Sequence, residues 1–122
     1  MTANTSKSRK GKARDLQNRV AEDLRASFSP LGSADIHPAI MGSSGIDILL
    51  SSRARDMLPY AIECKNQEAL SIWDALKQCQ ANAEKEALIP LLVFKRARSE
   101  TYAVLRWADL LALLVNGKVH HG

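Results

Sequence analysis

Apolar side chains recur at three- and four-residue intervals in the first part of the chain. The stripe consists of Ala13, Leu16, Val20, Leu24 and Phe28. Such spacing predicts an amphipathic helix over roughly residues 12–27, which ends before Pro30 and Gly32. At about 100° per residue, Gln17 falls inside the stripe and Glu22 on the opposite side. We therefore expect the polar side chain of Gln17 to face the core.

Short apolar runs further along the chain predict strands, because they are rich in β-branched residues and bounded by turn residues. These runs span residues 46–50, 60–65, 91–94 and 101–105, and a further short strand is a candidate within residues 35–40. Ser71 and Asp74 form a capping pattern that opens a second helix, which reaches about residue 87. A last helix is predicted over roughly residues 107–115. This order predicts an α/β fold in which helices flank one small mixed β-sheet.

The predicted second helix has an apolar stripe of its own. It is formed by Ile72, Leu76, Cys79 and Ala83. We expect Trp73, at the edge of this stripe, to belong to the core, with stacking on a nucleic-acid base as the alternative. Gln80 lies beside the stripe, whereas Gln78 points away from it.

The chain has 122 residues, of which 46% are hydrophobic, and this predicts one compact domain. We assign the domain to residues 12–117, between a disordered basic arm at residues 1–11 and a flexible tail at residues 118–122. No apolar run approaches the roughly 20 residues of a membrane span, and no hydrophobic stretch follows the N-terminus as in a secretory signal. The two cysteines form neither a disulfide framework nor a zinc cluster. We therefore expect a cytoplasmic protein that contacts no membrane and binds no small-molecule cofactor.

Basic residues are concentrated at the start of the chain, which has a formal net charge of +4. The bases that precede the first acidic residue, Asp15, are Lys7, Arg9, Lys10, Lys12 and Arg14. A basic arm on a nearly neutral domain is typical of attraction to a nucleic-acid backbone, although a solubilising tail has the same composition. A second basic cluster lies at a predicted turn, and Ser44 lies in a glycine-containing loop. The candidate nucleic-acid contacts are Lys10, Lys12, Arg14, Ser44, Lys95 and Arg96.

Three charged residues on the two middle strands carry the candidate chemistry. Glu63 and Lys65 are two positions apart, so they project from the same face of their strand, while Cys64 projects from the other. Asp47 lies among apolar residues on the preceding strand, where an unpaired carboxylate is costly. If these strands are neighbours, Asp47 approaches Glu63, and two adjacent carboxylates attract a cation such as Mg²⁺ or Mn²⁺. A same-face ion pair at a strand end is the alternative interpretation of Glu63 and Lys65.

With Asp47 as the first acid and Glu63-Cys64-Lys65 as the E-x-K element, the sequence resembles the PD-(D/E)xK nuclease superfamily. It is most similar to the small phage and archaeal Holliday-junction-resolvase-like endonucleases. The resemblance covers most of the chain, although Ile46 stands where the Pro-Asp pair has proline. It implies a restriction-endonuclease-like core and Mg²⁺- or Mn²⁺-dependent hydrolysis of phosphodiester bonds in DNA. It also implies a homodimer that acts on branched DNA in a prokaryotic or phage-infected cell.

The resemblance further implies roles for single residues. Asp47, Glu63 and the main-chain carbonyl of Cys64 would hold the metal ion, and Lys65 would position or activate the attacking water. Many members of the superfamily also place an acid from the first helix near the metal. Gln17 takes that place here, as glutamine does in some families, which leaves a second metal site open.

Two questions remain open from the sequence. Gln78 and Gln80 on the second helix are alternatives to Gln17 for completing the site. A non-catalytic DNA-binding module on a nuclease-like fold is the alternative function. The complete set of two acids and a lysine favours the enzyme, because a nuclease fold that has lost its activity in evolution normally lacks one of these three residues.

Overall fold

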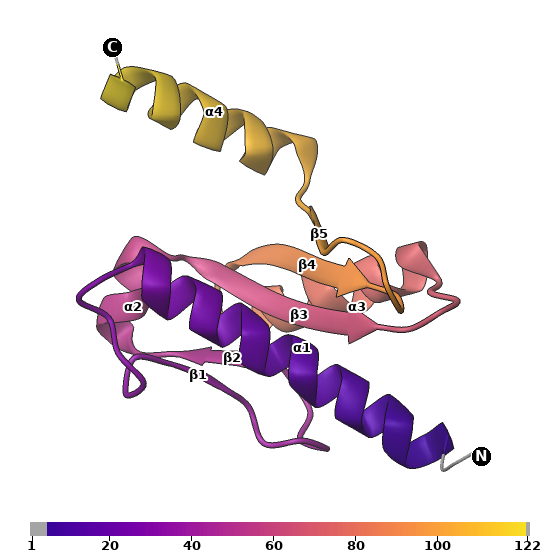
Figure 1. Ribbon diagram of the computed structural model, residues 1–122. Helices are drawn as coiled ribbons and strands as arrows, with labels where there is room; N and C mark the ends of the chain where they lie inside the picture. The colour runs from indigo at the N-terminus through magenta and orange to yellow at the C-terminus, as the bar shows by residue number, and fades with distance from the viewer. Residues whose placement is uncertain (1–4, 122) are drawn as a thin grey trace.

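The computed structural model describes residues 5–121, which form four helices and five strands (Figure 1). In chain order the elements are α1 (Thr5–Ser27), β1 (Ile36–Pro38), β2 (Ile48–Leu50), α2 (Ser52–Met57), β3 (Tyr60–Asn66), α3 (Ile72–Lys85), β4 (Ile89–Lys95), β5 (Tyr102–Val104) and α4 (Trp107–His121). The predicted α/β class is confirmed, and the elements follow the predicted order with one addition, the short helix α2.

The strands form two small sheets. β1 and β2 pair antiparallel, whereas β3, β4 and β5 form a three-stranded sheet in that order. β3 and β4 are parallel, since α3 carries the chain back between them, and β5 returns antiparallel beside β4. Figure 1 shows α1 in front of the three-stranded sheet and α3 behind it. The result is a small α/β core in which a mixed sheet is covered on both faces.

The pairing of the Asp47 strand with the Glu63 strand, which the sequence left as a condition, is not found in the structure. β2 does not join the ladder of β3, and a hydrogen bond from Asp47 N–H to the Ile62 carbonyl (3.1 Å) links the two regions instead. The segment between β2 and β3 also contains the short helix α2. Ser51 caps this helix, because its hydroxyl accepts a hydrogen bond from Ala54 N–H at 3.2 Å.

Both terminal helices are longer than their apolar patterns predict. α1 begins at Thr5, so residues 5–11 are helical and not the predicted disordered arm, and residues 1–4 lie outside the described residues. α4 continues to His121, through most of the predicted tail, and Gly122 lies outside the described residues. In α1 the extension is rich in lysine and arginine, which have good helix propensity, so a polar segment can lengthen the helix without an apolar stripe. Within residues 5–121, no helix has the length and apolar character needed to cross a membrane.

The core is divided by the three-stranded sheet. On the α1 side, buried Leu16 and Val20 belong to one cluster with Ile62 of β3. On the other side, Cys79 of α3 packs with Leu92 of β4. The buried positions of α3 are Ala75, Cys79 and Ala83. Trp73 lies outside this narrow stripe and is 81% exposed, so the expectation that it belongs to the core is wrong.

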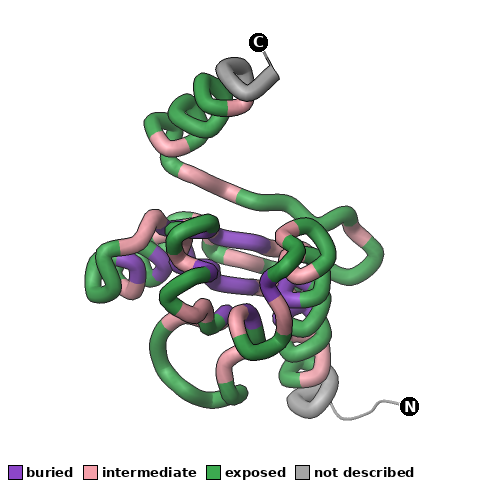
Figure 2. Tube along the Cα trace, turned by 90° about the vertical axis from the view of Figure 1, so that its left-hand side faces the viewer, coloured by how far each residue is buried: buried purple, intermediate pink, exposed green. Residues whose placement is uncertain are grey.

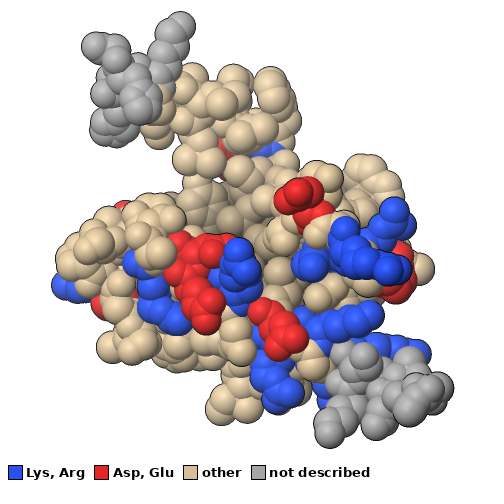
Figure 3. Space-filling view, in the orientation of Figure 1, with Lys and Arg blue, Asp and Glu red and all other residues tan. Residues whose placement is uncertain are grey.

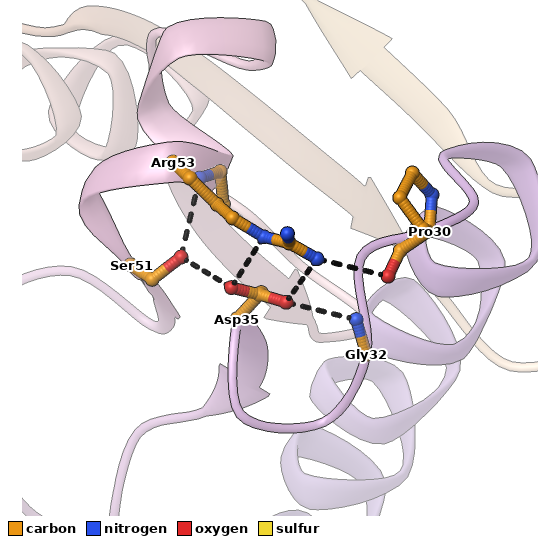
Figure 4. Close-up of polar contacts among 6 residues, drawn as sticks. Pro30, Gly32, Asp35, Ser51 and Arg53 are labelled. Atoms are coloured by element: carbon orange, nitrogen blue, oxygen red, sulfur yellow. Dashed lines mark hydrogen bonds and ion pairs between the residues drawn. The ribbon is translucent and has the colours of Figure 1, made fainter.

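A polar network around Asp35 joins the loop before β1 to α2 (Figure 4). The Asp35 carboxylate accepts hydrogen bonds from Ser51 Oγ (2.8 Å) and Gly32 N–H (3.1 Å), and it pairs with Arg53 Nε at 3.3 Å. Arg53 Nη2 also donates to the Pro30 carbonyl at 3.1 Å. These bonds lower the pKa of Asp35 below its ordinary value. The network therefore supports the small β1–β2 sheet, which positions the loop that leads to Asp47.

Candidate active site

Asp47 lies where the two sheets meet, directly before β2. Its carbonyl accepts a hydrogen bond from Ala39 N–H (2.8 Å), and its N–H donates to the Ile62 carbonyl of β3 (3.1 Å). The preceding loop turns through Gly42 and Gly45, whose φ angles are +89° and +103°. Glycine adopts such angles without strain, so the loop can deliver Asp47 to the edge of β3.

The carboxylate of Asp47 reaches the backbone of β3. Its Oδ2 atom accepts a hydrogen bond from Cys64 N–H at 2.7 Å. Burial raises the pKa of the Asp47 carboxyl group above its ordinary value, whereas this hydrogen bond and the positive charge of Lys65 act in the opposite direction. Asp47 is thus a partly buried acid beside a lysine. Its ionised carboxylate is stabilised by a positive charge close to it.

Glu63 is the more deeply buried of the two acids, with an exposed fraction of 2%. Its Oε2 atom accepts a hydrogen bond from Asn82 Nδ2 of α3 at 3.1 Å. Burial, and after it the negative charge of Asp47, raises the pKa of Glu63 to about 7. The two acids are therefore close enough to repel each other, as the sequence predicts, although β2 and β3 do not form a ladder.

A cleft of about 830 Å³ opens beside these residues. Asp47, Lys65 and Cys64 line it, together with Gln17 from α1. Glu63 is not among the lining residues, since its side chain is engaged with α3. The structure thus brings four of the five predicted catalytic and metal-binding residues to one cleft and leaves Glu63 buried next to it.

Two amide side chains in this cleft have an acceptor atom without a partner. Gln17 is 7% exposed, as expected from its place in the apolar stripe, and its Oε1 atom has no hydrogen-bond partner among the described residues. The same holds for Oδ1 of Asn66, whose Nδ2 donates to the Lys12 carbonyl of α1 at 3.1 Å. Unpaired buried acceptors are uncommon and costly, so both atoms are available to a donor or a cation in the cleft.

The other two glutamines lie elsewhere. Gln80 lines a separate groove beside Trp73, and Gln78 is exposed on α3. Of the three glutamines considered from the sequence, Gln17 is therefore the one that borders the cleft.

The basic side chains of α1 form one wall of the cleft. Arg9 and Lys12 line it, whereas Lys10 and Arg14 are exposed further around the helix. Figure 3 shows Lys and Arg side chains gathered at the side of the molecule where α1 begins. The sequence analysis did not select Arg9 as a contact. Because the predicted helix began near residue 12, Arg9 had no predicted helix face; with α1 beginning at Thr5, it lies two four-residue steps before Gln17 and thus on a similar side of the helix.

The remaining predicted contacts lie around the cleft but do not line it. Ser44 borders a neighbouring hollow of about 400 Å³, which Asn82 of α3 also lines. Lys95 ends β4 opposite Asn66 of β3, and Arg96 begins the turn that follows. That turn is joined to the cleft, because Ala97 N–H donates to an oxygen of the cleft residue Glu68 at 2.7 Å.

Residues 13–121 match the model of a protein family described as "Phage putative PDDEXK endonuclease". The chain belongs to this family. A search of curated proteins found no match, and a search of solved structures found none. The resemblance to phage nucleases of the PD-(D/E)xK superfamily is thereby confirmed over nearly the whole chain, from the middle of α1 to the end of α4.

The oxygen atoms around the cleft are of the kind that Mg²⁺-like divalent cations prefer. Asp47 and Glu63 repel each other, and a cation between them would relieve this repulsion; the unpaired oxygen of Gln17 borders the same cleft as Asp47. Among the described residues, no three His, Cys, Asp or Glu side chains form a group that could hold a metal ion. Any metal site here would therefore combine the two carboxylates with amide or main-chain oxygens.

The two cysteines of the chain do not offer thiolate ligands at neutral pH. Burial, followed by the charges of Asp47 and Glu63, raises the pKa of the Cys64 thiol far above its ordinary value. Burial likewise raises the pKa of Cys79 to about 11. Cys64 can therefore serve a metal through its main-chain carbonyl, whereas its neutral side chain packs in the core.

Asn82 is the neighbour of the site that sequence reasoning missed. It holds Glu63 from α3, yet nothing in its spacing separates it from the other amide residues of that helix. Its position directly before the buried Ala83 places it at the edge of the buried stripe. The sequence indicates that position, but the contact of Asn82 with Glu63 is seen only in the structure.

Proposed function

We propose that this chain is a Mg²⁺- or Mn²⁺-dependent endodeoxyribonuclease that hydrolyses phosphodiester bonds, with branched DNA as its preferred substrate. The observation that carries the proposal is one cleft in which Asp47, Lys65 and the unpaired amide oxygen of Gln17 meet the basic residues Arg9 and Lys12. Acids, a lysine and an anion-attracting wall are the parts that phosphodiester hydrolysis requires. Membership of a nuclease family supports the same class of reaction.

In this proposal the acids hold the cation and the lysine acts on the water. Asp47, Glu63 and the Cys64 carbonyl would hold the ion, which would supply Lewis-acid stabilisation of the phosphate charge. The Cys64 N–H bond fixes the Asp47 carboxylate, and Asn82 fixes Glu63. Lys65 would orient the attacking water in the cleft and offset the negative charge that develops on the phosphate.

The basic residues would hold the DNA backbone on both sides of the cleft. Arg9, Lys10, Lys12 and Arg14 lie on α1, and Lys95 and Arg96 lie at the end of β4. Contacts of this kind position the substrate without reading its sequence. They would place the scissile phosphate over Asp47 and Lys65. We further propose that the enzyme acts as a homodimer in the cytoplasm of a prokaryotic or phage-infected cell, so that two sites can address two strands.

The test is a cleavage assay with labelled four-way, flap, linear duplex and single-stranded DNA, each with Mg²⁺, with Mn²⁺ and with a chelator. The proposal predicts cleavage that needs the metal and is fastest on the branched substrates. It also predicts that Asp47→Asn abolishes cleavage but leaves most DNA binding. Metal-independent cleavage, or equal cleavage by parent and Asp47→Asn, would contradict the proposal.

One observation favours the alternative of a non-catalytic DNA-binding module. Glu63 is buried, is held by Asn82 and does not line the cleft, so it is not openly presented to a substrate. In that alternative, DNA binds to the basic wall without being cut. The same assay separates the two functions, because the module would retain DNA with either metal and release no fragments.

A further inference from the structure

α4 stands apart from the rest of the chain. β5 ends at Val104 and α4 begins at Trp107, so Leu105 and Arg106 alone connect them. Figures 1 and 2 both show the helix extending away from the three-stranded sheet. Within residues 107–117 of α4, every residue is exposed except Asp109 and Gly117, which are half-buried. The stability of the helix therefore depends on contacts that it does not make within residues 5–121 of one copy.

The exposed surface of α4 is mainly apolar. The large apolar side chains described on α4, within residues 107–117, are all exposed, Leu114 by 56%; they are Trp107, Leu110, Leu111, Leu113, Leu114 and Val115. At about 100° per residue they cover an arc of about 200°, wider than the roughly 100° stripe of an ordinary surface helix. Ala112 lies at the centre of the opposite face. An arc of this width indicates a helix that packs between two surfaces.

A groove of about 450 Å³ with matching character lies on the same chain, beside α3. Trp73, Leu76, Leu92 and Val104 provide its apolar lining, and Trp73 is 81% exposed. Its charged lining residues, Lys77 and Arg106, are basic. Arg106 pairs with Asp109 of its own α4 at 2.7 Å, so Lys77 is the lining base that such a helix leaves to a partner.

We propose that two copies of this chain exchange their α4 helices, each helix docking in the α3 groove of the other copy. Leu105 and Arg106 line the groove, and directly after them α4 extends away from the three-stranded sheet (Figures 1 and 2), so we infer that the groove is filled by the helix of a second copy. In a reciprocal exchange, each α4 helix covers one α3 groove, so no helix and no groove is left over. The resulting dimer is closed and has twofold symmetry. The second side of the wide apolar arc then meets the α4 of the partner.

The area of such an interface agrees with that of a stable dimer. A helix of 15 residues is about 22 Å long, and half of its surface amounts to about 400 Å². Two helices and the two surfaces that they cover then bury on the order of 1,600 Å², the standard size of a specific protein–protein interface. The proposal concerns the exchange of α4 and does not rest on the nuclease activity.

The test is sedimentation of the full chain at micromolar concentration, with chelator and without DNA. We expect the parent to be a dimer. Leu114→Glu on the apolar arc and Trp73→Glu in the groove should each weaken dimerisation by about tenfold or more, because a charge must be buried. The matched control Ala112→Glu, on the opposite face of α4, should remain dimeric. Circular dichroism checks that each variant is folded.

Mixing the two weakened variants distinguishes exchange from any other dimer. A pair made of Leu114→Glu and Trp73→Glu chains retains one intact helix in one intact groove, so the mixture should recover dimers that neither variant forms alone. Absence of recovery would overturn the exchange and indicate another α4 contact. A monomeric parent, or equal sedimentation of Leu114→Glu and Ala112→Glu, would overturn the whole proposal.

Discussion

Glu63 is a buried acid whose protonation is coupled to folding. In the metal-free protein its pKa is raised from 4.5 to about 7, so between these pH values the folded chain binds more protons than the unfolded chain. Stability should therefore decrease as the pH rises from about 4.5 through 7. Glu63→Gln should remove this decrease and raise the free energy of unfolding at pH 8 by about 1–3 kcal/mol.

Urea unfolding with chelator, at several pH values between 5 and 8, measures this effect. Glu22→Gln on the exposed face of α1 is the matched control, because it removes an acid without a burial cost. An unchanged pH dependence in Glu63→Gln would show that Glu63 is already ionised in the folded protein.

Asn82 of α3 supports the site through its contact with Glu63. Because it donates to Glu63 at 3.1 Å, it should hold the carboxylate in the orientation that a cation requires. Asn82→Ala should lower the cleavage rate by about 10–100-fold and raise the metal concentration needed for half-maximal cleavage. The exposed neighbour Gln78 provides the control variant, Gln78→Ala. A metal titration identical to that of the parent would limit Asn82 to a structural role.

At the scale of elements, the position of each basic residue around the axis of α1 determines whether it lines the cleft. Arg9 and Lys12 line it, whereas Arg19 is exposed and paired with Asp23 at 3.2 Å. Arg9→Ala should weaken DNA binding about equally for all sequences and lower the slope of its salt dependence by about 1. Arg19→Ala should leave that slope unchanged. Fluorescence anisotropy over a range of salt concentrations measures both, and equal slopes for the two variants would remove Arg9 from the interface.

Residue types and short-range spacing were sufficient to predict most of the elements. The stripe through Leu16 and Val20 predicted the buried face of α1 and also the burial of Gln17. Non-local contacts could not be predicted in this way. The separation of β2 from β3 depends on the hydrogen bonds of Asp47, and the role of Asn82 depends on a partner 19 residues away in the chain.

At the scale of the whole molecule, the cleft and the α4 groove lie in different parts of the chain. The cleft is bordered by α1 and the end of β3, whereas the groove lies between α3 and β5. A dimer formed through α4 would therefore leave both clefts open to DNA. Cleavage and dimerisation can accordingly be tested with separate variants.

The most direct test of the central claim is the rate of single-turnover cleavage of a labelled four-way DNA junction with Mg²⁺, at protein concentrations that saturate binding. Parent and Arg19→Ala should cleave at the same rate. Lys65→Ala should cleave at least about 100-fold more slowly while it binds the junction with similar affinity. We expect this because the lysine takes part in the chemical step and contributes little to DNA binding. Cleavage by Lys65→Ala at the parental rate, or no cleavage by the parent with either metal, would contradict the account.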